Sequence, residues 1–227
     1  MENKVGRICA EGFSFFGMTN RLISHEVKNI LAIISETSGL MYELVELSEK
    51  GMPLPPDKLR SLSGSMIEDV ERANRIIRNM NTFAHSVDDF IREVDIREIV
   101  GLMMEVCPLD STLRKTELNL VGGDACVIYT SPLFLENLLF HAINFSLRHP
   151  GPGKKIGISI DSKDSRTRIA LSGLASHITG EFPTRKEALL AAALSAEITF
   201  EPNRAELHIE FPERIEESPI QSLLPID

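Results

Sequence analysis

The sequence is poor in features that would each have pointed to a particular class of protein. It has three cysteines in 227 residues, Cys9, Cys107 and Cys126, and their wide spacing forms neither a Cys-x-x-Cys metal site nor an even disulfide set. No apolar run reaches the roughly 18 residues that a membrane-spanning helix needs. These absences predict a protein of the reducing cytoplasm that does not cross a membrane.

Positive charge is also scarce. The net charge is −9 at pH 7, from 24 Lys and Arg against 33 Asp and Glu. Such an excess of negative charge disfavours nucleic acid or an anionic membrane surface as the main partner. The hydrophobic fraction of 43% is that of a folded protein, and 227 residues suffice for two small domains.

A heptad-like pattern from Leu22 to Leu47 predicts a long amphipathic helix. Its apolar seam steps by alternate threes and fours through Val27, Ile30, Ile34, Thr37, Met41 and Leu44. At about 100° per residue, His25 lies roughly 150° around the helix from this seam. His25 is therefore expected to face solvent while the opposite face packs in a bundle.

The exposed face around His25 carries side chains that suit a reactive site. An imidazole is mostly neutral at neutral pH and can attack a phosphoryl group to form a phosphoramidate. Glu26 can hydrogen-bond a ring nitrogen, set its tautomer and accept its proton, and Asn29 can orient a water for hydrolysis. Lys28, Asn29 and Ala32 follow on the same face, and the small Ala32 leaves room for a docking partner. The alternative is an ordinary solvated histidine.

A second helix is expected after the turn-forming segment from Lys50 to Asp57, in which Asp57 can cap the helix. Two such helices joined by a short loop form an antiparallel hairpin. One hairpin cannot bury both apolar seams, whereas two hairpins from two chains form a four-helix bundle that does. The pattern therefore predicts a homodimer. The expected second seam is Leu59, Leu62, Met66, Val70, Ala73, Ile77, Met80, Ala84, Val87 and Ile91.

From about Val94 onward the pattern changes to a mixture of strands and helices. Ser131-Pro132 supplies a cap and a proline for the start of a helix, and the alanine-rich segment 188–196 favours another. This part of the chain is predicted to be an α+β sandwich of helices on one sheet. Strands are expected at 94–96, at 117–121 and 126–129 around a Gly122-Gly123-Asp124 turn, at 156–160 and 168–171, and in a final hairpin at 198–200 and 207–211.

The predicted hairpin resembles the dimerisation and histidine-phosphotransfer domain of two-component sensor histidine kinases. The segment Ser24-His25-Glu26-Val27-Lys28-Asn29 looks like their H-box, in which the histidine is phosphorylated. The family often has a proline just after this point, whereas Ile30 and Leu31 follow here. The resemblance implies that His25 carries the phosphoryl group and that response-regulator receiver domains are its partners.

The second half resembles the ATP-binding catalytic domain of the same kinases but lacks its nucleotide motifs. Asn137 matches an asparagine of the family's N-box, whereas His141 stands where the family has an asparagine that helps hold magnesium and phosphate. The Asp-x-Gly-x-Gly turn that reads adenine is replaced by Leu171-Ser172-Gly173-Leu174-Ala175-Ser176. The last helix begins Glu187-Ala188-Leu189 without the Gly-x-Gly loop that cradles phosphate. The resemblance implies a kinase-like fold, and the missing motifs predict that it holds no ATP, metal or other cofactor.

These features divide the chain into residues 1–92, a helical hairpin for dimerisation and phosphotransfer, and residues 93–227, a degenerate ATPase-like α/β domain. The leading hypothesis is a cytoplasmic histidine phosphotransfer protein of a phosphorelay. His25 would accept a phosphoryl group from a receiver-domain aspartate and pass it to another receiver without ATP. The 24 residues before His25 are too few for a sensor domain.

Three alternatives follow from the same residues. A diverged ATP-dependent sensor kinase would phosphorylate His25 from a nucleotide. A non-catalytic module would bind a response regulator through the face around His25. A phosphatase would use Glu26 and Asn29 to orient water.

Overall fold

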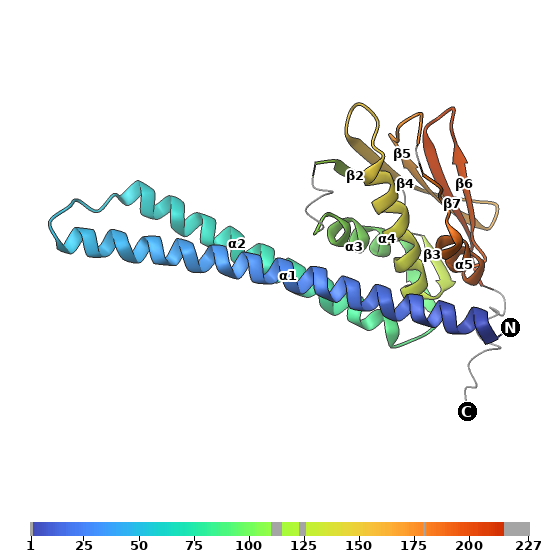
Figure 1. Ribbon diagram of the computed structural model, residues 1–227, viewed down its shortest axis with the longest axis horizontal. Helices are drawn as coiled ribbons and strands as arrows, with labels where there is room; N and C mark the ends of the chain where they lie inside the picture. Colours follow the sequence, from blue (N-terminus) through green and yellow to red (C-terminus); the bar gives the residue numbers. More distant parts are fainter. Residues whose placement is uncertain (1, 110–114, 123–125, 179, 216–227) are drawn as a thin grey trace. The chain divides into compact units, whose positions relative to one another are not determined.

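The computed structural model describes residues 2–109, 115–122, 126–178 and 180–215, with the backbone alone for residues 2–5 and 109. The chain forms two compact units: one is Asn20–Thr82, and the other joins Met1–Thr19 to Phe83–Asp227. The fold is α+β, as predicted, with an N-terminal helical region and a mixed sheet (Figure 1). The division into residues 1–92 and 93–227 stays a prediction.

The smaller unit is a hairpin of two helices. It contains α1 (Glu2–Glu49) from Asn20 onward and most of α2 (Pro56–Ala84). The seam predicted for α1 is confirmed, because Ile30 is buried and the other five seam residues are partly covered. The helix is longer than predicted, since it begins at Glu2 instead of near Leu22, so His25 lies at its middle.

The seam predicted for α2 is correct at Leu59, Leu62, Met66 and Ala73 and wrong at Val70 and Ile77. Ala73 and Ile76 are buried, whereas Val70 and Ile77 are 46% and 42% exposed. Ile76 and Ile77 are adjacent isoleucines, and the packing against α1 selects Ile76 for the seam. Val70 and Ile77 lie instead on the flank of the seam.

The larger unit is built on a five-stranded sheet with the order β2-β4-β5-β7-β6. All neighbouring strands are antiparallel except β2 and β4, which are parallel. A separate antiparallel pair joins β1 to β3. The strands are β1 (Arg92–Asp95), β2 (Glu117–Gly122), β3 (Val127–Thr130), β4 (Lys155–Lys163), β5 (Arg166–Ser172), β6 (Glu197–Glu201) and β7 (Glu206–Pro212).

The expected turn around Gly122 does not join its two flanking strands into a hairpin. The strand β2 pairs with β4 and β3 pairs with β1, so the two belong to different sheets. Gly123 and Asp124 lie outside the described residues. The pattern of apolar residues correctly predicted that both segments are strands. It could not predict their partners, because strand pairing depends on which segments become neighbours in the fold.

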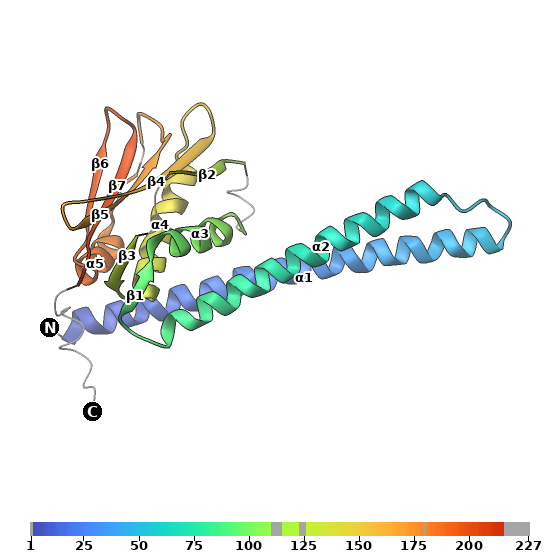
Figure 2. The same ribbon diagram turned by 180° about the vertical axis from the view of Figure 1, so that it is seen from behind.

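Three helices lie together on one side of the five-stranded sheet (Figures 1 and 2). They are α3 (Ile96–Val106), α4 (Pro132–Arg148) and α5 (Arg185–Ala193). Alternate residues of the central strands are buried, among them Ile158, Ile169 and Ile209. Short 3-10 helices, η1 (His85–Val87) and η2 (Cys107–Leu109), follow α2 and α3.

The first turns of α1 form a further layer of this unit. Phe15 is fully buried, and its ring centre lies 5.4 Å from that of Phe140 on α4 and 5.4 Å from that of Phe83. The helix α4 is therefore covered on two sides, and most of its residues are buried. A helix that is largely apolar all round fits such a position between two layers.

Two kinds of feature are absent from the part of the chain that the structure describes. None of its helices combines the length and apolar character needed to cross a bilayer. It also contains no cluster of three or more His, Cys, Asp or Glu side chains placed to hold a metal ion. The three cysteines are free thiols, and burial raises the pKa of Cys107 well above its ordinary value.

Candidate functional site

The His25 side chain lies on the outer face of α1 in the hairpin unit. In the heptad that uses Val27 and Ile30 as its two core positions, His25 occupies the position farthest from the seam. His25, Lys28 and Ala32 are all exposed, as their spacing predicted. The ring is therefore accessible to another protein, and the docking roles of Lys28 and Ala32 stay predictions.

Asn29 lies one helical turn beyond His25 and contacts one of its ring nitrogens. The amide nitrogen Nδ2 of Asn29 is 3.2 Å from Nδ1 of His25. In this orientation the amide donates to Nδ1, and the neutral ring carries its proton on Nε2. With the amide turned over, its oxygen accepts a hydrogen bond from Nδ1–H and the lone pair of Nε2 is free to attack. Asn29 can therefore select the ring tautomer, a task that the sequence had suggested for Glu26.

Glu26 points toward the second helix of the hairpin. Its side chain is 4% exposed, and its carboxylate accepts a hydrogen bond from Arg72 of α2. Both residues occupy the g position of their heptads, which directly precedes a core position. In an antiparallel pair of helices, the g positions of the two helices lie on the same side of the seam and face each other. The spacing of apolar residues did not single out Arg72, although pairing the g positions of the two helices would have identified it. A catalytic role for Glu26 stays a prediction.

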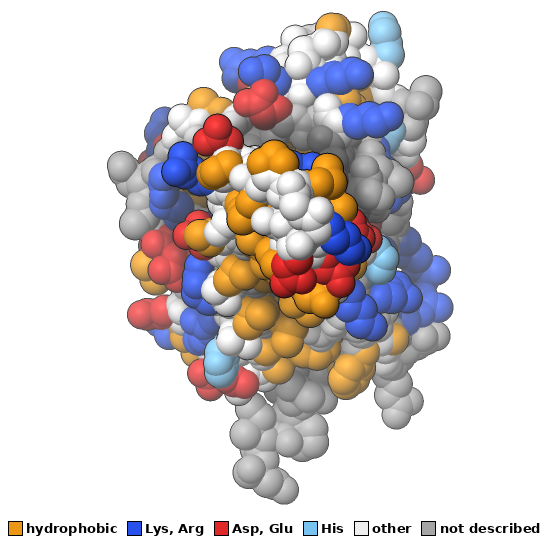
Figure 3. All heavy atoms as spheres, turned by 90° about the vertical axis from the view of Figure 1, so that its left-hand side faces the viewer, with side chains coloured by type: hydrophobic (Ala, Val, Ile, Leu, Met, Phe, Trp, Pro, Cys, Tyr) orange, Lys and Arg blue, Asp and Glu red, His pale blue; other side chains and the backbone are white. Residues whose placement is uncertain are grey.

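The other side of the hairpin exposes apolar side chains. Leu31 and Val45 of α1 and Val70 and Ile77 of α2 each follow a core position, the e position of the heptad, and are between 42% and 55% exposed. Figure 3, which faces the loop end of the hairpin, shows hydrophobic side chains gathered on its surface. On the Glu26 side, Ile33, Leu40 and Leu47 of α1 are likewise 36–43% exposed, so both sides of the hairpin carry exposed apolar residues.

The glycine that remains from the expected adenine-binding motif has a structural role. Gly173 follows β5 and has a φ of +84°, in the left-handed region that favours glycine. A Cβ at this position would lie 2.3 Å from the carbonyl oxygen of Lys155. The turn itself therefore requires this glycine.

The start of α5 lies at the position in the chain where the resemblance implies a phosphate-binding loop. The helix begins at Arg185, two residues earlier than predicted, and is capped by Thr184. The hydroxyl of Thr184 accepts a hydrogen bond from the Lys186 amide at 3.3 Å, and the Glu187 carboxylate accepts one from the Thr184 amide at 2.8 Å. The helix thus caps its own first turn, and Glu187 adds negative charge where an anion would bind.

His141 and Asn137, the two N-box positions on α4, are held by other parts of the same unit. The Nδ1 atom of His141 is 3.7 Å from a carboxylate oxygen of Glu187. Burial, with the positive charge of Lys186, lowers the pKa of His141 to about 4. Asn137 is fully buried, and its amide donates to the carbonyl oxygen of Glu11 at 3.5 Å. These positions therefore serve the packing of α1, α4 and α5.

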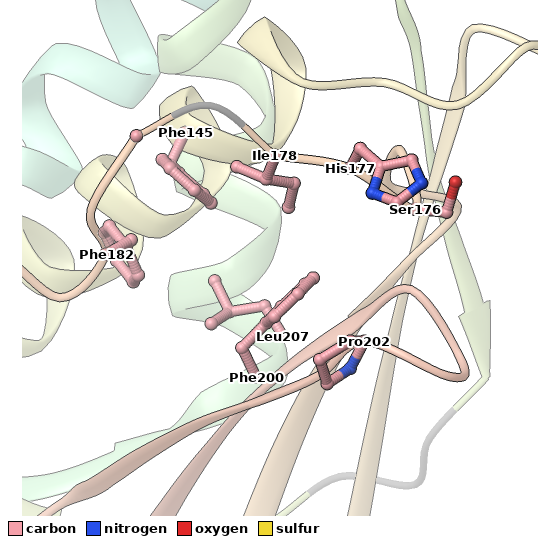
Figure 4. A pocket seen from close by; sticks show the side chains of 9 residues that line it. Phe145, Ser176, His177, Ile178, Phe182, Phe200, Pro202 and Leu207 are labelled. Atoms are coloured by element: carbon pink, nitrogen blue, oxygen red, sulfur yellow. The ribbon is translucent and has the colours of Figure 1, made fainter.

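One cavity lies beside α4, and another lies between α1 and α5. The first, of about 320 Å³, is walled by Phe145, Phe182 and Phe200 (Figure 4). Among the described residues that line it there is no Lys, Arg, Asp or Glu side chain. This cavity therefore has neither the aspartate that reads adenine in the kinases nor a cation for phosphate.

The second cavity, of about 380 Å³, does contain cations. Arg7, Arg185 and Lys186 line it together with Glu11, and the Glu11 carboxylate is 2.5 Å from the Lys186 ammonium. The chain's own carboxylate thus already pairs with Lys186, while Arg7 and Arg185 add positive charge to the same lining. Neither cavity has, among its described lining residues, the aspartate that the resemblance to kinases implies for adenine.

Comparison with known proteins finds likeness in structure. No protein-family model matches the sequence, and no curated protein sequence matches it. Histidine kinase AdeS of Acinetobacter baumannii is 14% identical with a TM-score of 0.45, over 83% of this chain and 98% of that chain. A histidine kinase of Burkholderia phymatum is 13% identical with a TM-score of 0.43, over 82% and 99%. A bacterial phosphotransferase is 13% identical with a TM-score of 0.48, over 86% and 94%.

Proposed function

We propose that this protein is a histidine phosphotransfer protein of a two-component phosphorelay and that it works without ATP. His25 takes a phosphoryl group from an aspartyl phosphate on one response-regulator receiver domain and passes it to the aspartate of another. The observation that carries the proposal is the exposed His25 ring with Asn29 at its Nδ1 atom. This contact leaves Nε2 as the nitrogen that meets a partner.

The transfer step uses the tautomer in which Nδ1 carries the proton. Nε2 attacks the phosphorus, the N–P bond forms, and the P–O bond to the aspartate breaks, so that its carboxylate leaves with the bonding electrons. The proton stays on Nδ1, where the Asn29 oxygen accepts its hydrogen bond. In the second transfer the N–P bond breaks and a carboxylate oxygen of the second receiver forms the new P–O bond. Because phosphoryl transfer depends mostly on positioning, a fixed ring orientation is valuable.

Two further parts of the molecule support the proposal. The exposed e-position residues Leu31, Val45, Val70 and Ile77 suit a homodimer in which two hairpins form a four-helix bundle. His25 lies at the outermost heptad position, so it stays open in such a bundle. We assign docking of the receiver to Lys28 and Ala32, with the α/β domain as a further docking surface.

Two carboxylates near the start of α5 support independence from ATP. Glu11 pairs with Lys186, and Glu187 caps the first turn of α5. Both carboxylates lie beside the helix start that would otherwise attract phosphate. A nucleotide would have to displace one and bind beside the other.

The test is labelling with two donors. A receiver domain carrying ³²P on its aspartate should label the wild-type protein and the His85→Ala control, which removes another exposed histidine, but not His25→Ala. Labelled ATP with magnesium should label none of them. Equal labelling of wild type and His25→Ala would disprove the proposal.

The other outcomes identify the alternatives. Labelling of His25 by ATP would establish a diverged kinase. Receiver binding that survives His25→Ala without any labelling would establish a non-catalytic module. Release of phosphate from the receiver that depends on Asn29 but not on a labelled His25 would establish a phosphatase.

A further inference from the structure

The hairpin has a second polar contact at the level of His25, and the transfer step does not use it. The Nη2 atom of Arg72, on α2, donates to Oε1 of Glu26. The Glu26 side chain is 4% exposed and that of Arg72 is 39% exposed. The ion pair therefore joins the two helices one residue away from the reactive ring.

Burial gives this pair a mechanical consequence. A buried carboxylate needs compensating partners, and Arg72 is the one that α2 supplies to Glu26. The turn of α1 that carries Glu26 cannot rotate away from α2 without separating Glu26 from Arg72. Since successive side chains leave a helix about 100° apart, holding Glu26 against α2 also fixes the direction in which His25 projects.

We infer that Arg72 is a positioning residue for phosphoryl transfer at His25 and that it acts through Glu26. The inference rests on the proposed phosphotransfer function. Arg72 sets the rotation of this turn and hence the line along which Nε2 meets the phosphorus. A misplacement of about 1 Å can lower a rate on the order of 100-fold, so a fixed rotation matters to transfer more than to folding.

The chemistry of the guanidinium separates positioning from simple charge compensation. Arginine presents its N–H donors in a rigid planar fork, whereas lysine is a flexible point charge. Arg72→Lys can neutralise Glu26 but holds its direction less firmly. A lysine here is therefore expected to preserve the stability of the hairpin while it loses part of the transfer rate.

The experiment measures single-turnover transfer from a phosphorylated receiver over a range of receiver concentrations. Arg72→Met should lower the maximal rate by about 10- to 100-fold and leave the half-saturating receiver concentration unchanged. Arg72→Lys should fall between Arg72→Met and wild type. Arg75→Met, the matched control at an exposed arginine on the same helix, should transfer like wild type. The exchanged pair Glu26→Arg with Arg72→Glu should recover much of the lost rate.

Circular dichroism melting curves show whether each variant is folded and give its melting temperature, so that a loss of transfer can be told apart from a loss of stability. A wild-type rate in Arg72→Met would overturn the inference. So would a loss that follows melting temperature across all variants, or a loss confined to the half-saturating concentration, which would make Arg72 a docking residue.

A second readout needs no phosphoryl transfer. The ¹⁵N chemical shifts of the His25 ring report its tautomer, and Arg72→Met should change them because the contact with Asn29 is displaced. Unchanged ring shifts would refute the positioning role while leaving the phosphotransfer proposal intact. Failure of the wild type to accept phosphate at His25, with altered ring shifts in Arg72→Met, would refute the proposed function alone.

Discussion

His25 and His141 each lie in a long helix with an asparagine one turn away, yet their environments are opposite. His25 is exposed, and Asn29 contacts its ring. The side chain of His141 is 19% exposed and faces Glu187, while Asn137 donates to a carbonyl group of α1. A histidine and an asparagine four residues apart, in opposite order in the two helices, therefore give an accessible ring on α1 and a neutral packed ring on α4. Burial by neighbouring elements, and not the local motif, separates the two.

The largest expected effect tests this comparison at the histidines. His25→Gln should reduce labelling by a phosphorylated receiver to background, because the proposed transfer forms its N–P bond at the His25 ring. His141→Gln should keep most of the labelling, because a buried ring with a pKa near 4 takes no part in transfer. Quantitative ³²P labelling of both variants at equal protein concentration measures the difference. Loss of labelling in both, with both proteins folded, would contradict the assignment.

The next effect compares two phenylalanines of α1 that lie two residues apart. Phe15 is fully buried between Phe83 and Phe140, whereas Phe13 is 80% exposed. Phe15→Ala should lower the free energy of unfolding by about 3–5 kcal/mol, and Phe13→Ala should change it by no more than about 0.5 kcal/mol. Urea unfolding of the full chain gives both values. Equal effects would mean that the first turns of α1 do not pack on α4.

A third comparison concerns two buried carboxylates. Glu26 is paired with Arg72, whereas Glu136 on α4 accepts a hydrogen bond from the Ser86 hydroxyl at 2.5 Å. Burial raises the pKa of Glu136 from 4.5 to about 8. The folded protein keeps a proton that the unfolded chain releases near pH 4.5, so stability should fall as pH rises from about 4.5 to about 8 and then level off.

The magnitude and control for Glu136 follow from the same linkage. The loss contributed by this one group should be a few kcal/mol, since each unit of pKa shift is about 1.4 kcal/mol. Glu136→Gln should remove that part of the pH dependence. Urea unfolding at pH 5, 7 and 9 isolates it as the difference between the two proteins, and identical pH profiles would refute the raised pKa.

The smallest effect compares the two sides of the hairpin. Ile77 on the e side and Ile33 on the g side are 42% and 43% exposed. If the e side forms the dimer, Ile77→Ala removes apolar contact from both copies and should weaken dimerisation about tenfold. Ile33→Ala should leave the dissociation constant unchanged within about twofold. Sedimentation equilibrium measures both, and equal effects would place the interface elsewhere.

Local periodicity was sufficient for part of the fold and part of the site. It predicted the seam of α1 because each α-helix has the same angular spacing, and it therefore predicted that His25 is exposed. It was less reliable in α2, where either Ile76 or Ile77 fits an apolar stripe. It also did not predict the partners of β2 and β3. The strand β2 pairs with β4 and β3 pairs with β1, and both partners come from elsewhere in the chain.

The sequence established that His25 faces outward and that the start of α5 lacks glycine, because both follow from residue identity and the geometry of a single helix. The folded chain was needed to show that Glu26 meets Arg72 and that Glu11 meets Lys186. Glu26 and Arg72 are 46 residues apart in the sequence, and Glu11 and Lys186 are 175 residues apart. The periodicity of a single helix cannot predict contacts between residues so distant in sequence. Such pairs form because packing brings their elements together and burial then leaves a charged side chain few alternative partners.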